Sequence, residues 1–269
     1  MYDSQFTLEM NKIEQLSYSD YLQVQQLLSL QKFQSPNKEH DELLFIIIHQ
    51  VYELWFKQMI HELVGLKKDL LNQIHHKILL TLKRMRHILK VIGLQIDILE
   101  TMGPLSFLSF RNYLGSASGF QSFQFRELEF IFGFKNEKLL NNPIFTSDEN
   151  NRLKQRFDDT SIWQDFLAFF KIQVYKDKNF SLVENSELSE EQEILIHLYK
   201  NSSILMEISE LIVDIDEGLQ EWRYRHIKMV ERTIGGGKVG TGGSSGVEYL
   251  KRSLFKSFCP ELWEIRNYF

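Results

Sequence analysis

The sequence predicts an all-α fold, from its scarcity of helix breakers and from the spacing of its apolar residues. Four prolines occur in 269 residues, and half of the 14 glycines lie between positions 235 and 246, so most of the chain is free to form helices. Apolar residues make up 43% of the chain and recur at helical rather than alternating intervals in several long stretches. We therefore expect a large helical bundle built on long antiparallel helices.

Two of these long helices are predicted in the first half of the chain. The stretch from Asp41 to about Leu71 follows a Ser-Pro-Asn turn and has apolar residues at helical spacing, so we expect a long buried helix. The second stretch, from about Ile78 to Met102, ends at a Gly-Pro pair, which is a common helix stop. Two antiparallel helices are the simplest arrangement of these stretches.

A third long helix is predicted nearer the C-terminus. Ser189 and Gln192 form a capping-box pattern, and the apolar periodicity then continues to about Ile234, so one unusually long helix is expected there. The residues between these helices are less regular. Residues 104–130 are rich in phenylalanine and contain a GSASG segment, whereas residues 135–188 indicate shorter helices and loops.

The composition indicates in which cellular compartment the chain works and which class of partner it binds. Cys259 is the single cysteine, so no intramolecular disulfide is possible and a reducing compartment is the natural setting. The start of the chain has no signal-peptide pattern, and the longest apolar run, 43–48, is far too short to span a bilayer, so we expect a cytoplasmic protein with no membrane partner. A formal net charge of -5 argues against binding to nucleic acid, which leaves a small molecule as the expected partner.

Two histidines are the first candidates for chemistry. His49 lies four residues after Phe45, so both side chains fall on one helix face about one turn apart. A histidine framed by aromatic residues can hydrogen-bond a ligand in a pocket, although core histidines are commoner. His226 lies in the segment EWRYRHIKMVER, and a neutral imidazole on a rigid helix suits a haem axial ligand. The alternative is a hydrogen-bonded helix histidine beside surface arginines such as Arg223.

An arginine and a glycine-rich loop also suggest a ligand site. Arg111 follows the run Phe107–Phe110, where a guanidinium could grip a carboxylate with two hydrogen bonds; a surface salt bridge is the alternative. The loop IGGGKVGTGGSSG, which contains Thr241, suggests a backbone that closes over a ligand or needs positive φ. A flexible linker is the competing interpretation, and the apolar sequence on both sides of the loop weakens it.

Several formal motif matches lack the structural context that their chemistry requires. Residues 235–246 contain both G-x-G-x-x-G and G-x-S-x-G, but each of these motifs needs a preceding strand, which an all-helical chain does not offer. A Walker A motif is excluded because Val239 follows Lys238 where serine or threonine is required. No histidine has a glutamate three residues before it, so a di-iron centre of the ferritin type is not expected.

Three long segments resemble the tryptophan 2,3-dioxygenase family of haem enzymes: DELLFIIIHQVYELWFKQMIHEL, FRNYLGSASGFQSFQFRELEF and WRYRHIKMVERTIGGGKVGTGGSSGVEYL. The resemblance extends to LSYSDYLQVQQLL near the start and FCPELWEIR near the end, and it is weakest over residues 135–188. It therefore implies one all-helical domain over residues 1–269, in which long antiparallel helices enclose a haem pocket. It also implies that residues 1–35 contact a neighbouring subunit.

The resemblance implies a role for individual residues. His226 matches the proximal histidine that coordinates the haem iron, and His49 matches the distal, catalytic histidine near the indole N–H of the substrate. Phe45 matches an aromatic residue of the indole pocket, and Arg111 matches the arginine that pairs with the substrate carboxylate. The other matched positions are the distal-side serine near the haem and substrate, Ser118; the glycine-loop threonine at the amino-acid end of the substrate, Thr241; a pocket position where some relatives carry tyrosine, Phe107; and two tyrosines that reach a neighbouring subunit's active site, Tyr18 and Tyr21.

The activity that this resemblance implies is the insertion of both atoms of O₂ across the indole C2–C3 bond of L-tryptophan by ferrous haem b. The product is N-formyl-L-kynurenine, and the reaction is the first step of tryptophan catabolism by the kynurenine pathway. The implied assembly is a homotetramer with N-terminal segments exchanged between subunits. Phe107 in place of tyrosine removes a polar contact, which we expect to alter affinity more than reaction type. Three alternatives remain open: an enzyme on the same scaffold that adds a single oxygen atom or hydroxylates another aromatic amino acid, a haem- or tryptophan-binding sensor, and a helical scaffold without a cofactor.

Overall fold

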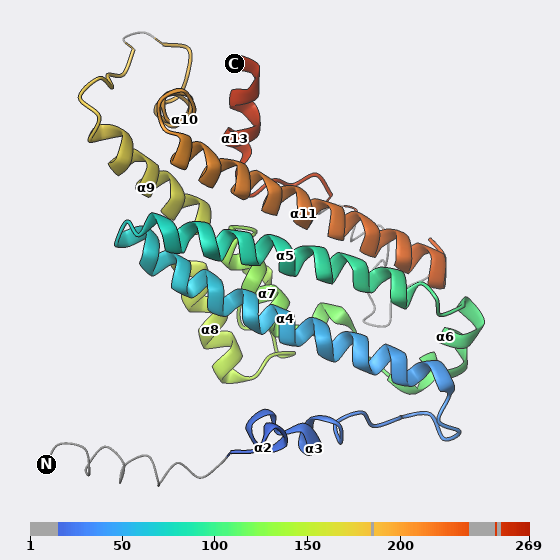
Figure 1. Cartoon of the computed structure of the whole chain (residues 1–269). Helices are drawn as coiled ribbons and strands as arrows, with labels where there is room; N and C mark the ends of the chain where they lie inside the picture. Colours follow the sequence, from blue (N-terminus) through green and yellow to red (C-terminus); the bar gives the residue numbers. More distant parts are fainter. Residues whose placement is uncertain (1–15, 184–185, 237–250, 252–253) are drawn as a thin grey trace, which may run out of the picture.

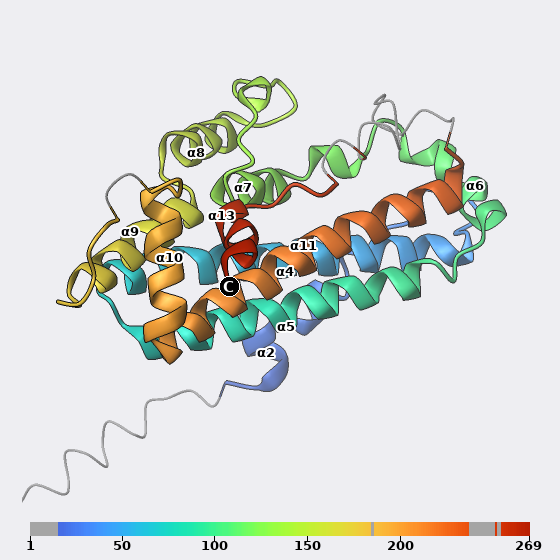
Figure 2. The same cartoon turned by 90° about the horizontal axis from the view of Figure 1, so that it is seen from above.

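Three long helices form the frame of the molecule. The computed structural model describes residues 16–183, 186–236, 251 and 254–269, and all the regular structure in these residues is helical. The long helices are α4 (His40–Leu71), α5 (His75–Leu99) and α11 (Ser203–Ile234), which lie side by side in two perpendicular views (Figure 1, Figure 2). α4 runs antiparallel to α5, as the sequence predicts. α5 packs against both of the other helices.

Shorter helices cover this frame at both ends and on one face. α6 closes the end where α4 begins and where α5 and α11 finish, and α9 and α10 lie at the opposite end (Figure 1). α7 packs on α4, and α8 packs on α7 (Figure 2). The bounds of these elements are α6 Pro104–Arg111, α7 Phe123–Ile131, α8 Ser147–Asp158, α9 Ile162–Tyr175, α10 Glu190–Asn201 and α13 Pro260–Glu264, with 3₁₀ turns η1 Asn112–Leu114, η2 Gly119–Gln121, η3 Glu137–Leu139 and η4 Ile265–Tyr268.

The prediction of one helix from Ser189 to Ile234 is wrong, because the structure divides this stretch into α10 and α11 at Ser202. The capping box of Ser189 and Gln192 is confirmed at the start of α10. Ser202 has extended backbone dihedrals, φ -142° and ψ 106°, and its hydroxyl accepts a hydrogen bond from the backbone N–H of Leu205. The serine therefore ends one helix and caps the next.

The two other long helices match their predictions closely at most boundaries. α4 begins one residue before the predicted start, whereas α5 is shifted towards the N-terminus and ends at Leu99 instead of Met102. Gly103 is the N-cap of α6 and Pro104 takes its first position, where the missing N–H costs nothing. The expectation of a long buried helix over residues 41–71 holds for one side of α4 only, because the other side is exposed and includes Leu54.

The core has a separate cluster at the α6 end of the frame. This cluster, called here the α6-end cluster, joins buried residues of α4, α5, α6 and α11: Ile48, Ile96, Leu99, Met102, Phe107, Phe110 and Met229. The main core occupies the middle and the opposite end of the frame, between α4, α5, α7, α9 and α11. The α6-end cluster therefore brings three segments together that lie far apart in the sequence.

No single helix among the described residues is long and apolar enough to cross a membrane. One bent pair, α5 with Pro104–Leu114, reaches the required length and composition, and its two halves are inclined by 89°.

The N-terminal arm, residues 16–35, lies along the outer side of α4 (Figure 1). Its helices α2 (Tyr18–Leu22) and α3 (Val24–Leu27) bury no residue, so their apolar side chains face solvent. The buried carboxylate of Glu42 on α4 holds the end of the arm, because it accepts hydrogen bonds from the backbone N–H groups of Gln34 and Ser35 at 2.6 and 3.2 Å. The arm is thus anchored at one end and exposes an apolar face.

Candidate functional site

Two histidines from different long helices meet beside the α6-end cluster. His49 lies in the first half of α4, and His226 lies in the last third of α11. Burial lowers the pKa of His226 to about 4, and the nearby His49 disfavours a charge on it further. His226 is therefore a neutral imidazole at pH 7. Both residues were expected in the site, and the structure brings them together.

One backbone hydrogen bond orients the His49 ring. Its Nδ1 lies 2.7 Å from the carbonyl oxygen of Phe45, which can accept but cannot donate, so Nδ1 carries the hydrogen and Nε2 carries the lone pair. Desolvation lowers the pKa of His49, more than the Phe45 carbonyl and the nearby Glu53 raise it. The side chain is nonetheless accessible to solvent in the single chain. A ligand N–H group could therefore reach Nε2 and donate to it.

Three phenylalanines from α4 and α6 form an aromatic wall next to His49. The rings of Phe45 and His49 are 4.1 Å apart, and Phe107 and Phe110 lie 5.7 and 5.6 Å from Phe45. Phe107 and Phe110 meet edge to face at 5.4 Å. Phe110 was not among the expected site residues, although its position three residues after Phe107 places both on one side of α6. Such a wall suits a planar aromatic ligand.

Polar groups lie at the end of α6 and in the turn that follows. Arg111 is the last residue of α6 and is half-buried, directly after the buried Phe110 of the aromatic wall. Ser118 caps η2, and its hydroxyl oxygen accepts a hydrogen bond from the N–H of Phe120 at 3.3 Å. The hydroxyl hydrogen remains able to donate to a ligand.

The other predicted site residues are not assembled around the histidines in this single chain. Tyr18 and Tyr21 are 77% and 72% exposed on α2, which lies along α4 and away from α6 (Figure 1). Thr241 lies outside the described residues. Arg223, expected on the surface beside His226, is in fact buried and lies over the ring of Phe134 at 4.2 Å.

The donor set around His226 fits a prosthetic group that needs one protein ligand. The described residues contain no group of three or more His, Cys, Asp or Glu side chains that could hold a metal ion. Haem brings four equatorial nitrogens of its own and needs an axial imidazole, which must be neutral to offer its lone pair to iron. The low pKa of His226 meets that requirement. Trp222 supports the imidazole from within the bundle, because its ring stacks on that of His226 at 5.6 Å and 17°.

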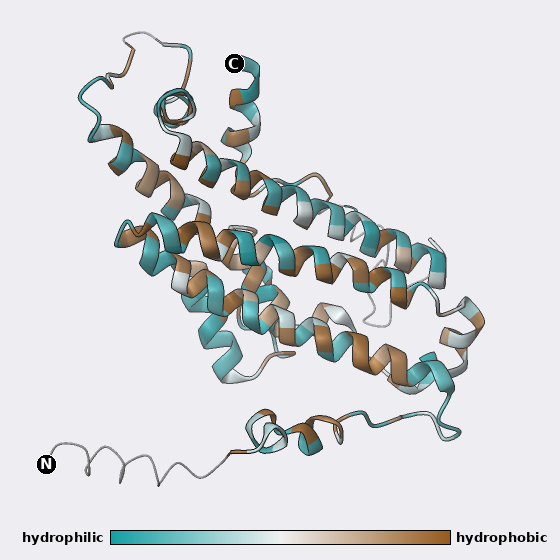
Figure 3. Cartoon of the chain, viewed as in Figure 1, coloured by the Kyte–Doolittle hydropathy of each residue, from teal (hydrophilic) through white to brown (hydrophobic). Residues whose placement is uncertain are grey.

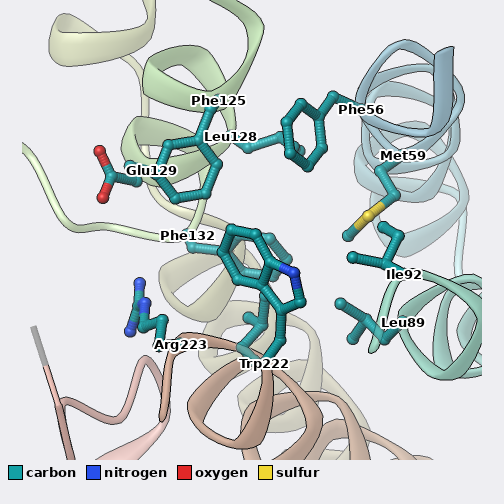
Figure 4. Close-up of a pocket in the computed structure, with 11 residues that line it drawn as sticks. Phe56, Met59, Leu89, Ile92, Phe125, Leu128, Glu129, Phe132, Trp222 and Arg223 are labelled. Carbon is teal, nitrogen blue, oxygen red and sulfur yellow. The ribbon is translucent and has the colours of Figure 1, made fainter. Parts of the chain in front are cut away.

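A small cavity lies in the core beside Trp222. Its volume of about 20 Å³ is too small for an aromatic amino acid. Figure 4 shows the Trp222 indole among the apolar side chains that line this cavity, including Phe56, Phe125, Phe132 and Ile92. The candidate ligand site is therefore the region around the histidine pair and the aromatic wall, and not this cavity.

Comparisons with known proteins agree with this geometry. The family model for tryptophan 2,3-dioxygenase matches residues 5–173 and 176–269. The tryptophan 2,3-dioxygenase of Herpetosiphon aurantiacus is 47% identical over 259 residues, which cover 93% of this chain and 97% of the relative. The enzymes of the same name from Anaeromyxobacter sp. (strain K) and Nocardioides sp. are 43% and 42% identical, and each alignment covers 94% of this chain and 96% and 94% of the relative.

Proposed function

The chain belongs to the tryptophan 2,3-dioxygenase family, and we propose that it inserts both atoms of O₂ across the indole C2–C3 bond of L-tryptophan. The product is N-formyl-L-kynurenine, which starts tryptophan catabolism by the kynurenine pathway. The observation that supports this proposal most directly is the pair of neutral histidines beside an aromatic wall. One of these histidines suits iron ligation, and the other suits an indole N–H.

His226 is the residue that would hold the haem. Ferrous haem b supplies the iron that binds O₂ and carries the oxygen chemistry. Trp222 stacks on the imidazole and limits its rotation, so the ligand is presented in one orientation. His49 does not ligate in this proposal, because its Nε2 lone pair is directed to the substrate by the Nδ1–H bond to Phe45.

The remaining residues hold the substrate in place. The aromatic wall of Phe45, Phe107 and Phe110 packs against the indole, and Nε2 of His49 accepts the indole N–H, so the ring has one preferred orientation. Arg111 pairs with the carboxylate of tryptophan. Ser118 and Thr241 complete the distal side and the amino-acid end of the site. Phe107 has no hydroxyl to offer, so the polar contact that a tyrosine would make at this position is absent.

The assembly we propose is a homotetramer in the cytoplasm. An exposed apolar face runs along α4 and α5, and its residues include Leu43, Ile47, Leu54, Leu80, Val91 and Leu94. Figure 3 shows hydrophobic segments of these two helices in brown. An open groove of about 630 Å³ lies on this face, and large exposed apolar surfaces are typical of interfaces. Tyr18 and Tyr21 on the exposed N-terminal arm would reach the site of a neighbouring subunit. The free, buried Cys259 suits a reducing compartment.

Steady-state turnover of the haem-loaded protein tests this function. The protein is reduced without oxygen, mixed with L-tryptophan and O₂, and followed by oxygen consumption and by the absorbance of N-formylkynurenine. We expect many turnovers, with one O₂ consumed for each product molecule. A normal haem spectrum without turnover would identify a sensor instead, and colourless protein after haem-replete expression would contradict the proposal.

A further inference from the structure

Helix α5 carries none of the proposed site residues, yet both histidine-bearing helices are bonded to its backbone at adjacent carbonyl groups. The hydroxyl of Tyr52 on α4 donates to the carbonyl of Ile92 at 3.0 Å. The guanidinium of Arg225 on α11 donates to the carbonyl of Gly93 at 3.1 Å. Tyr52 follows His49 by three residues, and Arg225 directly precedes His226.

Arg225 has a second contact on α5 that fixes its position along the helix. Its other terminal nitrogen donates to the carboxylate of Asp97, four residues after Gly93. Residues four apart lie on successive turns of a helix, so the planar guanidinium contacts two successive turns of α5. A slide of α11 along α5 or a rotation of α11 would break one or both contacts.

Tyr52 also contacts the residue that supports His226. Its ring lies 6.3 Å from that of Trp222, and Trp222 stacks on His226. Figure 4 shows Trp222 directed into the core towards Ile92, whose carbonyl accepts the Tyr52 hydroxyl. Tyr52 therefore links α4 both to the backbone of α5 and to the support of the imidazole on α11.

We propose that Tyr52 and Arg225 are positioning residues, which set the separation and the rotation of His49 and His226 through their bonds to α5. Apolar packing between the helices is non-directional, whereas hydrogen bonds to fixed carbonyls depend on distance and angle. The inference rests on the proposed function, because the gap between the two histidines is the space that would receive haem and substrate. Both histidine-bearing helices are thus held in position by hydrogen bonds to the same helix, α5.

A second pair of charged residues between the same helices provides a matched control. Arg86 of α5 pairs with Asp214 of α11 at 2.8 Å, and both side chains are partly exposed, like those of Arg225 and Asp97. This pair lies about two turns from Gly93 along α5, and three turns from His226 along α11. Its loss should affect helix packing without moving the histidines.

The test compares Tyr52→Phe, Arg225→Met and Arg86→Met in the haem-bound, full-length protein. Tyr52→Phe keeps the ring against Trp222 and removes the hydroxyl. We measure the iron–imidazole stretching frequency of the ferrous protein by resonance Raman, the rate of haem transfer to apomyoglobin, and the Tm. Tyr52→Phe removes one hydrogen bond and should shift the stretching frequency and speed haem loss about fivefold. Arg225→Met removes two contacts and should change both measurements at least as much. Arg86→Met should lower the Tm and leave both haem measurements unchanged.

A conservative variant and the wild type complete the design. Arg225→Lys keeps the charge and one donor, so it should restore part of the stretching frequency and of the haem retention. Equal haem spectra and haem loss in Tyr52→Phe, Arg225→Met and Arg86→Met would overturn the inference, whatever their Tm. If Arg225→Met does not fold, the haem spectra and haem loss of Tyr52→Phe and Arg225→Lys test the inference instead. Wild-type protein that takes up no haem would instead refute the proposed function, and the positioning role with it.

Discussion

Individual surroundings make the two histidines of the site chemically different. Burial keeps His226 neutral, with a pKa of about 4, whereas a backbone carbonyl fixes the tautomer of His49. The spacing of Phe45 and His49 in the sequence predicts a shared helix face, and the structure confirms their contact. The tautomer could not be predicted, because the Nδ1 bond depends on the side-chain rotamer as well as on the helix. The burial of Arg223 was missed for the same kind of reason, since a charged residue has no sequence signal for burial.

Substitution of Arg111 tests the binding of the substrate carboxylate. Arg111→Leu should raise the KM for L-tryptophan by about 10- to 100-fold, because a charge-assisted, two-point hydrogen bond contributes roughly 1.5–3 kcal/mol. Steady-state kinetics give this value. Arg111→Lys retains the charge but not the planar guanidinium, so its KM should lie between those of the wild type and Arg111→Leu. An unchanged KM in Arg111→Leu would show that another group binds the carboxylate.

Substitution of His226 tests the haem ligand. His226→Ala should lose haem, because it removes the imidazole that the proposal assigns to the iron. The ratio of Soret to protein absorbance in purified protein measures the loss. His87→Ala is the control, because His87 is also a histidine within a long helix, but it lines the groove on α4 and α5, which contains none of the proposed site residues. Full haem content in His226→Ala, with a wild-type spectrum, would rule out this ligand.

Among whole elements, long helices were predictable and the interruptions in them were not. The start of α4 follows a proline turn and carries Asp41 and Glu42 in its first turn, so the sequence marks its beginning well. The break at Ser202 has no proline or glycine, and the apolar residues keep their spacing of three and four on either side of it. A single capping serine marks the break in the sequence, and one serine does not end a helix without tertiary contacts. Periodicity alone therefore joined α10 and α11 into one helix.

The anchor of the N-terminal arm gives a pH prediction at this scale. Desolvation raises the pKa of Glu42, but hydrogen bonds from Ser35 and Gln34 outweigh it, and the folded pKa lies below the ordinary 4.5. As the pH falls, Glu42 is therefore protonated in the unfolded state before it is protonated in the folded state. Its contribution to the free energy of unfolding is fully present above about pH 4.5 and is lost as the pH falls through the folded pKa.

Glu42→Gln should lower the free energy of unfolding at pH 7 by about 1–3 kcal/mol, because the buried donors lose a charged acceptor. The free energy of unfolding should also fall less steeply in this variant than in the wild type when the pH is lowered from about 5 to about 3, the range around the ordinary pKa of a glutamate. Urea unfolding at several pH values measures both effects. Glu217→Gln, on the exposed side of α11, is the control and should match wild type. An acid-induced loss of stability that is equal in Glu42→Gln and wild type would contradict this role.

Over the whole molecule, the site depends on contacts between distant parts of the sequence. α4, α6, the cap of η2 and α11 supply its residues, and the apolar α6-end cluster brings α4, α6 and α11 together. The sequence predicted the all-helical class and, through the family resemblance, most of the residues. It could not predict that α5 would bond to both histidine-bearing helices, since Tyr52 and Arg225 belong to no motif. The exposed arm and the apolar face of α4 and α5 are the surfaces on which the proposed homotetramer would form.

Charge introduced into this apolar face tests the homotetramer. Leu54→Glu should reduce the mass in solution, because Leu54 is 52% exposed in the single chain and lines the groove. Burial of an unpaired carboxylate at an interface costs several kcal/mol. Leu71→Glu is the control, since Leu71 is 82% exposed at the end of the same helix and outside the groove. Sedimentation equilibrium gives the masses. A tetramer that tolerates Leu54→Glu, or a monomeric wild type, would contradict the proposed interface.

The most direct test of the central claim is the fate of labelled oxygen. Haem-loaded, ferrous protein is given L-tryptophan under ¹⁸O₂ in ordinary water, and the product is analysed by mass spectrometry before the formyl group exchanges or hydrolyses. The account predicts N-formylkynurenine in which both new oxygen atoms carry the label. A product with one labelled oxygen atom would contradict dioxygenation and identify a monooxygenase on the same scaffold.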